Sequence, residues 1–415
     1  MHDMKDSGVE WIGEIPAHWS PIRFRFIAKI TTGNQDTQNA EPDGEYPFYV
    51  RSPIVERCNN YTFDGKGILM AGDGAGAGRV FHLVDGKYAV HQRVYRFYDF
   101  KYMDPVLLKY YLENLFATVM DYGSAKTTVP SVRLPMIQDF VVCVPPKKEQ
   151  DNIVAVLNEK CAQVGSLISN VQAQIEKLKA YKQSLITEVV TKGLDPTVPM
   201  KDSGFEWIGE IPAHWEITRK LAFVTTEGIS YGIVKLFDPD DVNGVKVLRC
   251  SDVLEGFIKP DNIRTVTREV SNEYARTILA GGEVLVNVRG SLGGCAVVPK
   301  TMAGYNIARE VAKIALNDSM CNRYVMYYLL SRCFVEYRTS RLSGSVYVGL
   351  NIELLSSCPL PNPDLAEQTA IADYLDEKCS QIDRLIAIKQ AKIEKLEQYK
   401  RSLIYEYVTG KREVS

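Results

Sequence analysis

The segment MKDSGVEWIGEIPAHW spans residues 4–19, and MKDSGFEWIGEIPAHW spans residues 200–215, with a single difference between them. A second, longer pair begins with EQDNIVAVLNEKC at residue 149 and with EQTAIADYLDEKC at residue 367. Repeats of this kind constrain the architecture more strongly than any local signal. The chain is therefore a tandem duplication, in which a short motif, a variable stretch and a long helical motif occur twice.

The two variable stretches share a layout although their sequences differ. Each contains an apolar run that leads into glycines, GILMAGDGAGAG at 67–78 and GEVLVNVRGSLGG at 282–294. Each continues with a helical run containing Tyr-Tyr-Leu, a Gly-Ser loop, and a short apolar strand before prolines. Short strands separated by glycine turns predict two related α+β domains.

The long motif carries apolar residues at alternating spacings of three and four, which is the heptad pattern of a coiled coil. Pro146 precedes the first copy, Asp364 and Glu367 have the spacing of a helix cap in the second, and Gly193 follows the first. The predicted seam residues are Leu157, Val164, Ile168, Ile175, Leu178, Leu185, Leu375, Ile382, Ile386, Ile393, Leu396 and Leu403.

We expect the two helices to pair as an antiparallel coiled coil, because their seams have the same length and nearly the same composition. About 43 residues at 1.5 Å each give a rod of roughly 65 Å. An approximate two-fold axis would then relate the halves, and the rod would separate the two globular domains. The alternative is that each helix packs only on its own globular domain.

The composition excludes several classes of protein. The 415 residues are 46% hydrophobic and 24% charged, which is typical of globular domains. No apolar run approaches the ~18 residues of a membrane span, and the polar N-terminus does not resemble a signal peptide. The nine cysteines include no C-x-x-C pair, so we expect reduced core thiols in a cytoplasmic protein. The net charge of −2 neither requires nor forbids a nucleic-acid partner.

Motifs for common chemistry are missing. The sequence has no G-x-x-x-x-G-K-[ST] phosphate loop, and the alternating glycines at 72–78 do not match the dinucleotide fingerprint. The five histidines form no pair with the spacing of metal ligands. We therefore expect a chain with no catalytic residues, no metal and no cofactor of its own.

The motif W-I-G-x-I-P-x-H-W, present at 11–19 and 207–215, and the two E-Q-x-x-I helices resemble the specificity subunit of type I restriction-modification systems. The resemblance implies that each variable stretch reads one half of an asymmetric, bipartite site on double-stranded DNA. It also implies that the helices set the spacer and dock two methyltransferase subunits, and that restriction subunits bind the assembly. S-adenosylmethionine, ATP and Mg²⁺ would belong to those partners, and adenine would be the methylated base.

In these terms the predicted order has five segments. They are a first target-recognition domain over 1–148, a spacer helix over 149–192, a linker over 193–199, a second target-recognition domain over 200–366 and a second spacer helix over 367–415. A different interpretation of the same pattern is a coiled-coil adaptor that binds protein partners through two related domains.

Readout of DNA sequence uses Arg or Lys for guanine, Asn or Gln for adenine, and small polar groups or backbone amides for phosphates. The glycine turns supply Arg79 in the first half, and Arg289 and Ser291 in the second. The Gly-Ser loops supply Ser124, Lys126, Thr127 and Thr128, and then Arg341, Ser343, Ser345 and Tyr347. Each of these segments is alternatively an ordinary solvated turn.

Gln92 with Arg93, and Asn306 with Arg309, are further candidates, although they lie in apolar runs that predict strands. The repeated tryptophans (Trp11, Trp19, Trp207 and Trp215) have a different interpretation. Contacts that read two different half-sites should differ between the copies, whereas the tryptophan motifs are nearly identical. The sequence therefore favours a structural contact between each domain and a helix over base stacking.

Overall fold

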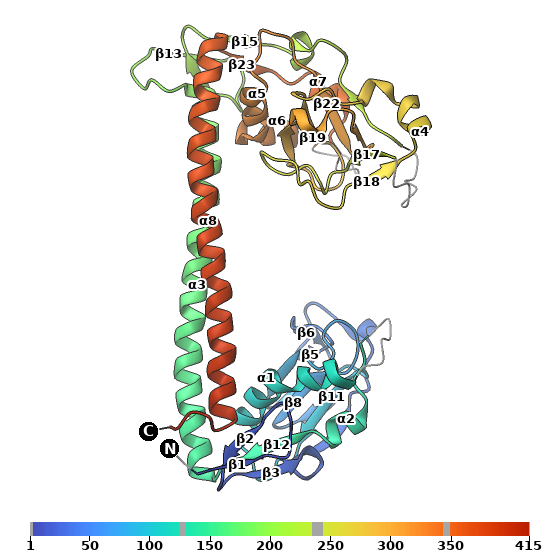
Figure 1. Cartoon of the computed structure of the whole chain (residues 1–415), viewed down its shortest axis with the longest axis vertical. Helices are drawn as coiled ribbons and strands as arrows, with labels where there is room; N and C mark the ends of the chain where they lie inside the picture. Colours follow the sequence, from blue (N-terminus) through green and yellow to red (C-terminus); the bar gives the residue numbers. More distant parts are fainter. Residues whose placement is uncertain (1–2, 124–129, 235–243, 343–348, 415) are drawn as a thin grey trace. The chain divides into compact units, whose positions relative to one another are not determined.

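The computed structural model describes residues 3–123, 130–234, 244–342 and 349–414, which form two compact units (Figure 1). Unit 1 comprises residues 1–172 and 391–415, and unit 2 comprises residues 173–390. The division passes through the two long helices, α3 (Lys147–Lys192) and α8 (Leu365–Val408), so each unit contains a segment of both.

Unit 1 is built on two four-stranded sheets with the orders β4-β11-β8-β9 and β6-β5-β10-β7. All neighbours are antiparallel except β5 and β10, which are parallel. A hairpin, β1-β2, and a two-stranded ladder, β3-β12, accompany them. The bounds are β1 Met4–Asp6, β2 Glu14–Pro16, β3 Ser20–Arg23, β4 Lys29–Thr32, β5 Tyr46–Tyr49, β6 Glu56–Cys58, β7 Phe63–Asp64, β8 Gly67–Ala71, β9 Phe81–Val84, β10 Lys87–Val90, β11 Val94–Tyr98, α1 Pro105–Gly123, α2 Leu134–Gln138 and β12 Val141–Val144.

Unit 2 repeats this strand order in its sheets β16-β22-β19-β20 and β18-β17-β21, although its described residues include no counterpart of β7. The pair β17-β21 is parallel, as β5-β10 is in unit 1. The duplication therefore extends through the variable stretches, and the predicted mixture of helices and short strands is confirmed. The bounds are β13 Met200–Asp202, β14 Glu210–Pro212, β15 Glu216–Thr218, β16 Ser230–Tyr231, β17 Val245–Leu248, β18 Arg264–Val266, α4 Arg268–Glu273, β19 Val284–Asn287, β20 Cys295–Val297, β21 Asn306–Ile307, β22 Val311–Ile314, α5 Asn322–Leu330, α6 Arg332–Leu342, α7 Ile352–Ser356 and β23 Leu360–Asn362.

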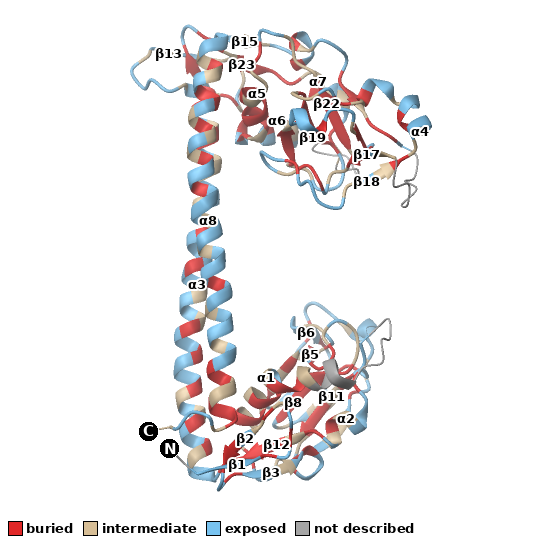
Figure 2. Cartoon of the chain, viewed as in Figure 1, coloured by how far each residue is buried: buried red, intermediate tan, exposed pale blue. Residues whose placement is uncertain are grey.

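The apolar runs before the glycine turns become the central strands β8 and β19. Ile68, Leu69 and Met70 of β8, which lies between β11 and β9, are fully buried (Figure 2). Ile68 and Met70 belong to one hydrophobic core and Leu69 to another, so both faces of the strand are covered. Phe116 on α1 belongs to the same hydrophobic core as Ile68 and Met70. An uninterrupted apolar run is the pattern expected of a strand buried on both faces.

Two glycines allow the backbone to approach the parallel strand pairs. A Cβ atom on Gly33 would lie 2.0 Å from the carbonyl oxygen of Val90, and one on Gly232 would lie 1.8 Å from that of Ile307. Real Cβ atoms do not approach an oxygen so closely, so any side chain would displace the strand. These positions require glycine for the same steric reason in both units.

Both long helices begin two residues before the predicted starts at 149 and 367; α3 ends at Lys192 as predicted, whereas α8 ends at Val408 and not at residue 415. Asp364 caps α8 by accepting a hydrogen bond from the Glu367 backbone N–H (2.8 Å), and Gly193 ends α3 with a φ of +73°. All the predicted seam residues are buried or half-buried. Leu157 of α3 lies in the hydrophobic core of unit 1, and Leu375 of α8 lies in that of unit 2, so the helices also pack on the globular cores.

Within unit 2 the two helix segments run antiparallel. Lys389 Nζ lies 2.6 Å from Gln174 Oε1, and Lys182 Nζ lies 2.7 Å from Asp383 Oδ2. Residue numbers therefore rise along α3 as they fall along α8. In unit 1, Leu403 and Tyr407 of α8 share a hydrophobic core with Cys161 of α3.

Candidate nucleic-acid interface

Several strand ends of unit 1 meet at one edge of the domain. The pairings Thr32 with Tyr95 and Ala71 with Val94 bring the ends of β4 and β8 to the start of β11. The parallel β5 and β10 end together at Tyr49 and Val90. We call the segments that continue from these ends, residues 33–37, 50–53, 72–76 and 91–93, strand-end surface 1. Loops at such an edge of a rigid scaffold are common sites of recognition.

Charged side chains on this surface are tied to one another. Asp73 lies in the glycine turn after β8, and its Oδ1 is 3.0 Å from Arg51 Nη1. The other carboxylate oxygen of Asp73, Oδ2, is 3.8 Å from Arg93 Nε. The close approach depends on Gly76, because a Cβ atom there would lie 2.6 Å from the Arg51 carbonyl oxygen. The glycine turn therefore places one carboxylate between two arginines.

The turn between β10 and β11 lies on the same surface. Gln92 and Arg93 are both exposed, and Gln92 Nε2 donates to Asp36 Oδ2 at 2.9 Å. Hydrogen bonds from the Gln38 backbone N–H and the Thr37 hydroxyl lower the pKa of Asp36. Buried His91 accepts a hydrogen bond from the Arg93 backbone N–H through Nδ1 (2.9 Å), and burial lowers the pKa of its imidazole.

Unit 2 has an equivalent edge, which we call strand-end surface 2 (residues 232–234, 249–253, 288–293 and 308–310). The pairing of Asn287 with Val311 brings the end of β19 to the start of β22. The pairing of Tyr231 with Ala312 brings the end of β16 to the start of β22 as well. Exposed Arg289 places its guanidinium carbon 5.7 Å from the centre of the Tyr231 ring. An arginine held over an aromatic ring presents its planar donors in a defined orientation.

Buried Asn287 shapes the turn that carries Arg289 and Ser291. Its side-chain Nδ2 donates to the carbonyl oxygens of Cys250 (2.9 Å), Val253 (3.0 Å) and Ser291 (3.1 Å). One amide therefore joins two neighbouring loops of the surface. Within the same surface, Arg249 Nε lies 3.2 Å from Asp252 Oδ2.

The structure brings most of the described candidates to these two surfaces. Arg289, Ser291 and Arg309 lie on surface 2, Gln92 and Arg93 lie on surface 1, and all are exposed. Arg79 is exposed in the loop that follows the glycine turn of surface 1. Arg341 is exposed on α6, with its guanidinium carbon 6.0 Å from the centre of the Tyr337 ring.

Asn306 is placed differently, because its side chain is fully buried. Its Oδ1 accepts from the Thr277 hydroxyl (2.6 Å), and its Nδ2 donates to Ser271 Oγ (3.0 Å). Asn306 therefore holds β21 against neighbouring turns, and we do not retain it as a residue that faces DNA.

Other candidates lie outside the described residues. These are Ser124, Lys126, Thr127, Thr128, Ser343, Ser345 and Tyr347. The segments that follow them are described: Val132 N–H donates to the Gly72 carbonyl (2.7 Å), and Leu350 N–H donates to the Val288 carbonyl (2.9 Å). In both units, the residues after the Gly-Ser loop thus pair with the turn after the central strand.

Arg51, Asp73 and Asp36 on surface 1, and Tyr231 beside surface 2, were not among the candidates predicted from the sequence. Only Asp73 had a sequence signal, since it stands inside the glycine run. Arg51 is placed by the parallel pairing of β5 with β10, and Asp36 by the bridge between Gln35 and His91. Tyr231 ends β16 and is placed by the antiparallel pairing of that strand with β22. Single-sequence patterns do not report such non-local pairing.

The repeated tryptophan motif joins each domain to the helix ends. Trp19 is buried, and its Nε1 donates to Glu149 Oε2 near the start of α3 (2.7 Å). A Cβ atom on Gly410, just after α8, would lie 3.2 Å from the Trp19 ring. Trp215 is likewise buried, and a Cβ atom on Gly193, just after α3, would lie 3.2 Å from the Trp215 ring. The structural role predicted for the tryptophans agrees with these contacts.

The glutamines of the two Glu-Gln motifs have matching roles. Gln150 Oε1 accepts from the Asp104 backbone N–H (2.7 Å), and its Nε2 donates to the Pro145 carbonyl (2.8 Å). Gln368 accepts from the Cys321 N–H (2.8 Å) and donates to the Pro363 carbonyl (2.9 Å). Each buried amide therefore ties the start of a long helix to the loop before α1 or α5.

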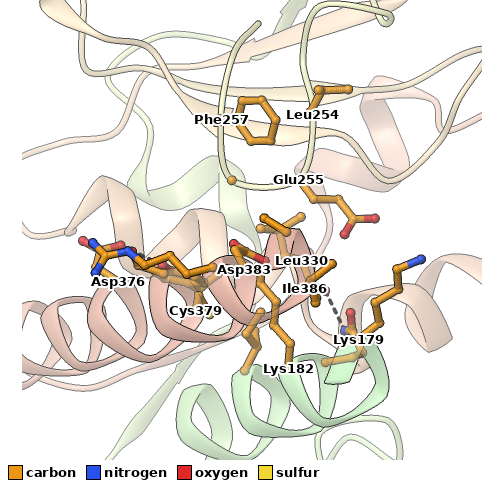
Figure 3. Close-up of a pocket in the computed structure, with 17 residues that line it drawn as sticks. Lys179, Lys182, Leu254, Glu255, Phe257, Leu330, Asp376, Cys379, Asp383 and Ile386 are labelled. Atoms are coloured by element: carbon orange, nitrogen blue, oxygen red, sulfur yellow. Dashed lines mark hydrogen bonds and ion pairs between the residues drawn. The ribbon is translucent and has the colours of Figure 1, made fainter. Parts of the chain in front are cut away.

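Each unit also has a groove between its helix pair and its globular domain. The groove in unit 2 has a volume of about 1070 Å³ and is lined by Tyr327, Cys379 and Lys182 (Figure 3). A hairpin with Leu254 and Phe257 faces these helices across the groove, and Phe257 is 57% exposed. In unit 1 the repeat-equivalent residues Tyr110, Cys161 and Lys400 line a groove of about 600 Å³.

The described residues contain no group of three or more His, Cys, Asp or Glu side chains arranged to hold a metal ion. All nine cysteines are free thiols, and burial raises the pKa of Cys333 to about 11. No helix among the described residues combines the length and hydrophobicity needed to cross a bilayer.

Comparisons with known proteins agree with the duplicated architecture. The family model "Type I restriction modification DNA specificity domain" matches residues 16–177 and again residues 216–398. The MjaVIII specificity subunit of Methanocaldococcus jannaschii is 25% identical over 415 residues, covering 96% of this chain and 93% of that protein. The EcoDI specificity subunit of Escherichia coli is 22% identical over 395 residues, covering 90% and 84%.

One solved structure has a similar fold. It comes from a study of complex assembly and conformational transition of the type I R-M system. The TM-score is 0.68 at 18% identity, and the match covers 96% of this chain and 99% of that chain.

Proposed function

This chain belongs to the type I restriction-modification DNA specificity family, and we propose that its two units read the two halves of an asymmetric DNA site. Strand-end surface 1 would contact one half-site, and strand-end surface 2 would contact the other. The DNA is double-stranded, and the bases between the half-sites are not read.

One observation carries this proposal. The same backbone framework occurs twice, but the exposed side chains that it presents differ. Surface 1 presents Gln92 and Arg93, whereas surface 2 presents Arg289 and Arg309. The tryptophan and glutamine joints, by contrast, are repeated almost unchanged. Constant joints with variable exposed residues are the pattern expected of a scaffold that presents two different readout surfaces.

We propose that α3 and α8 form an antiparallel coiled coil that sets the distance between the half-sites. α3 contains 46 residues and α8 contains 44 residues. At 1.5 Å per residue, each helix is roughly 65–70 Å long. The Gln174–Lys389 and Lys182–Asp383 contacts in unit 2 support this pairing. Burial of the seam residues in both units supports it as well.

We further propose that the helix pair docks two methyltransferase subunits, and that restriction subunits bind the resulting assembly. Four apolar side chains on the helices support two equivalent docking sites. Leu167 (47% exposed) and Tyr399 (51%) belong to unit 1, while their repeat counterparts Leu385 (47%) and Tyr181 (58%) belong to unit 2. Exposed apolar residues repeated in this way favour two copies of one partner.

Catalysis would then reside in the partners. S-adenosylmethionine would be bound by the methyltransferase subunits, and ATP with Mg²⁺ by the restriction subunits. This chain would contribute selection of the site and the geometry of the complex, without binding a cofactor itself.

A segment exchange tests the assignment of one half-site to each unit. Residues 20–148 would be replaced by the equivalent segment of another specificity subunit, and methylated adenines would then be mapped in cells with the partner methyltransferase. We expect one half of the motif to change while the other half and the spacer length remain. A change in both halves, or in neither, would contradict the proposal.

A further inference from the structure

The turn between β10 and β11 and the turn between β21 and β22 have the same backbone hydrogen bonds. Val94 N–H donates to the His91 carbonyl (2.9 Å), and Val311 N–H donates to the Ala308 carbonyl (3.0 Å). His91 bridges in parallel to Gln35, as Ala308 does to Ile233. The turns are therefore equivalent in the duplication, although no sequence motif relates them.

This equivalence pairs individual residues. The Gln92 N–H donates to the Gln35 carbonyl, and the Arg309 N–H donates to the Ile233 carbonyl, both at 2.9 Å. Gln92 and Arg309 thus occupy the same backbone position in the two units. Arg93 and Glu310 occupy the next position.

Both turns are fixed on their other side as well. The carbonyl of Arg93 accepts a hydrogen bond from the Gly72 N–H (2.9 Å), and the carbonyl of Glu310 accepts one from the Val288 N–H (2.8 Å). Each turn is therefore held between two neighbouring segments. A rigid backbone of this kind presents its exposed side chains with little loss of conformational entropy on binding.

Gln92 is oriented as well as exposed. The ionised Asp36 carboxylate only accepts hydrogen bonds, so the amide nitrogen of Gln92 must face it. Among the residues that the structure describes, none forms a hydrogen bond with the second amide N–H or the carbonyl oxygen of Gln92. One donor beside one acceptor is the arrangement that pairs with N7 and N6 of adenine in the major groove.

Arg309 offers a different set of donors. It is exposed, and no other described residue forms an ion pair with its guanidinium. Arginine presents parallel N–H donors, which match O6 and N7 of guanine. Arg93, the other arginine of these turns, is instead near Asp73 (3.8 Å).

We propose that Gln92 reads an adenine in one half-site and Arg309 reads a guanine in the other, with Asp36 as the positioning residue for Gln92. This inference rests on the DNA-reading function proposed above and names the bases that the two surfaces select. The two half-sites differ at this position because one backbone position carries two different side chains.

Single-base binding measurements test the proposal. The full-length chain would be purified with its methyltransferase partner, and binding would be measured to duplexes in which each base pair of the site is substituted in turn. For Gln92→Ala we expect the preference at one A·T pair of the first half-site to fall about tenfold to a hundredfold. For Arg309→Ala we expect the same loss at one G·C pair of the second half-site.

Matched controls separate readout from general effects. Gln163 on α3 is an exposed glutamine that donates to Glu159 at 2.9 Å, just as Gln92 donates to Asp36, so Gln163→Ala should leave every base preference unchanged. Arg268 is an exposed arginine at the start of α4 and serves as the control for Arg309. Thermal unfolding of each variant checks that it is folded.

Two further variants sharpen the test. Arg309→Gln should move the preference of that base pair from guanine towards adenine, and Asp36→Ala should weaken the adenine preference while leaving the second half-site unaffected. The inference is overturned if the base preferences survive in Gln92→Ala and Arg309→Ala, or if binding weakens equally on all duplexes. If the wild-type complex shows no bipartite preference at all, the proposed function itself fails.

Discussion

Trp19 donates its indole N–H to the carboxylate of Glu149, with 2.7 Å between Nε1 and Oε2. The same carboxylate lies 2.7 Å from His18 Nε2 through its other oxygen. In unit 2, Glu367 lies 3.1 Å from His214 in the equivalent position. The two most strongly repeated parts of the sequence, the tryptophan motif and the Glu-Gln motif, therefore meet at one joint in each unit.

Glu149→Ala should destabilise unit 1. The substitution leaves the part-buried Trp19 indole N–H without its charged acceptor, and such bonds contribute about 1.5–3 kcal/mol. The free energy of unfolding, measured by denaturant titration, should fall by about that amount. Glu159→Ala on the same helix is the control, because Glu159 is exposed and its side chain accepts a hydrogen bond from exposed Gln163; its effect should stay within about 0.5 kcal/mol. Equal effects of the two variants would contradict this role of Glu149.

The two buried glutamines should each affect their own unit. Gln150→Ala leaves the Asp104 N–H without its side-chain acceptor, and Gln368→Ala does the same to the Cys321 N–H. An unsatisfied buried donor costs about 1–3 kcal/mol. In hydrogen exchange, Gln150→Ala should lower protection around α1, and Gln368→Ala should lower it around α5. Loss of protection in the opposite unit would show that the two joints are not independent.

Gly232 should tolerate no side chain. A Cβ atom there would lie 1.8 Å from the Ile307 carbonyl oxygen, so Gly232→Ala must displace β21, at a cost of about 3 kcal/mol or more. A Cβ atom on nearby Gly228 would meet no heavy atom within 4 Å beyond its chain neighbours, and Gly228 has no positive φ, so Gly228→Ala should be nearly neutral. Differential scanning calorimetry of the two variants tests the contrast. A stable Gly232→Ala protein would show that the backbone approach is not required.

Acidification should loosen the turn that carries Gln92. Burial lowers the pKa of His91 below its usual 6.5, so the unfolded state takes up a proton more readily than the folded state. Stability from neutral His91 is therefore present above about pH 6.5 and is lost as the pH falls through that value towards the folded pKa. Protonation would also remove the acceptor for the Arg93 N–H.

The free energy of unfolding should accordingly fall between about pH 7.5 and 5.5. His91→Asn should reduce this dependence. His2→Asn is the control for the substitution itself, because residue 2 lies in the polar N-terminal segment, far in sequence from this turn. A slope that is unchanged in His91→Asn would exclude His91 as its source.

Local and repeated features of the fold were predictable from the sequence. The heptad seam, Gly193 and the Asp364 cap define α3 and α8, because helix periodicity and capping are local properties. The apolar runs at 67–71 and 284–287 became the central strands for a similar reason. Near-identity of the motifs also indicated that the tryptophans are structural.

The composition of the two surfaces was not predictable in the same way. Arg51 and Asp36 reach surface 1 only because β5 pairs in parallel with β10 and because the loop after β4 crosses that pair. Asn306 shows the opposite effect: its type and its arginine neighbour suggested readout, yet its side chain is buried and hydrogen-bonded to Thr277, Ser271 and Tyr274. Only tertiary pairing distinguishes a buried amide from an exposed one.

The most direct measurement is a genome-wide map of methylated adenine in the source cells, with and without this chain. Methylation of a control site in the same strain shows that the partner methyltransferase is active. We predict that a two-part, non-palindromic adenine motif disappears when the chain is absent and returns when it is restored. An identical map in the two strains would contradict the claim that this chain selects the site.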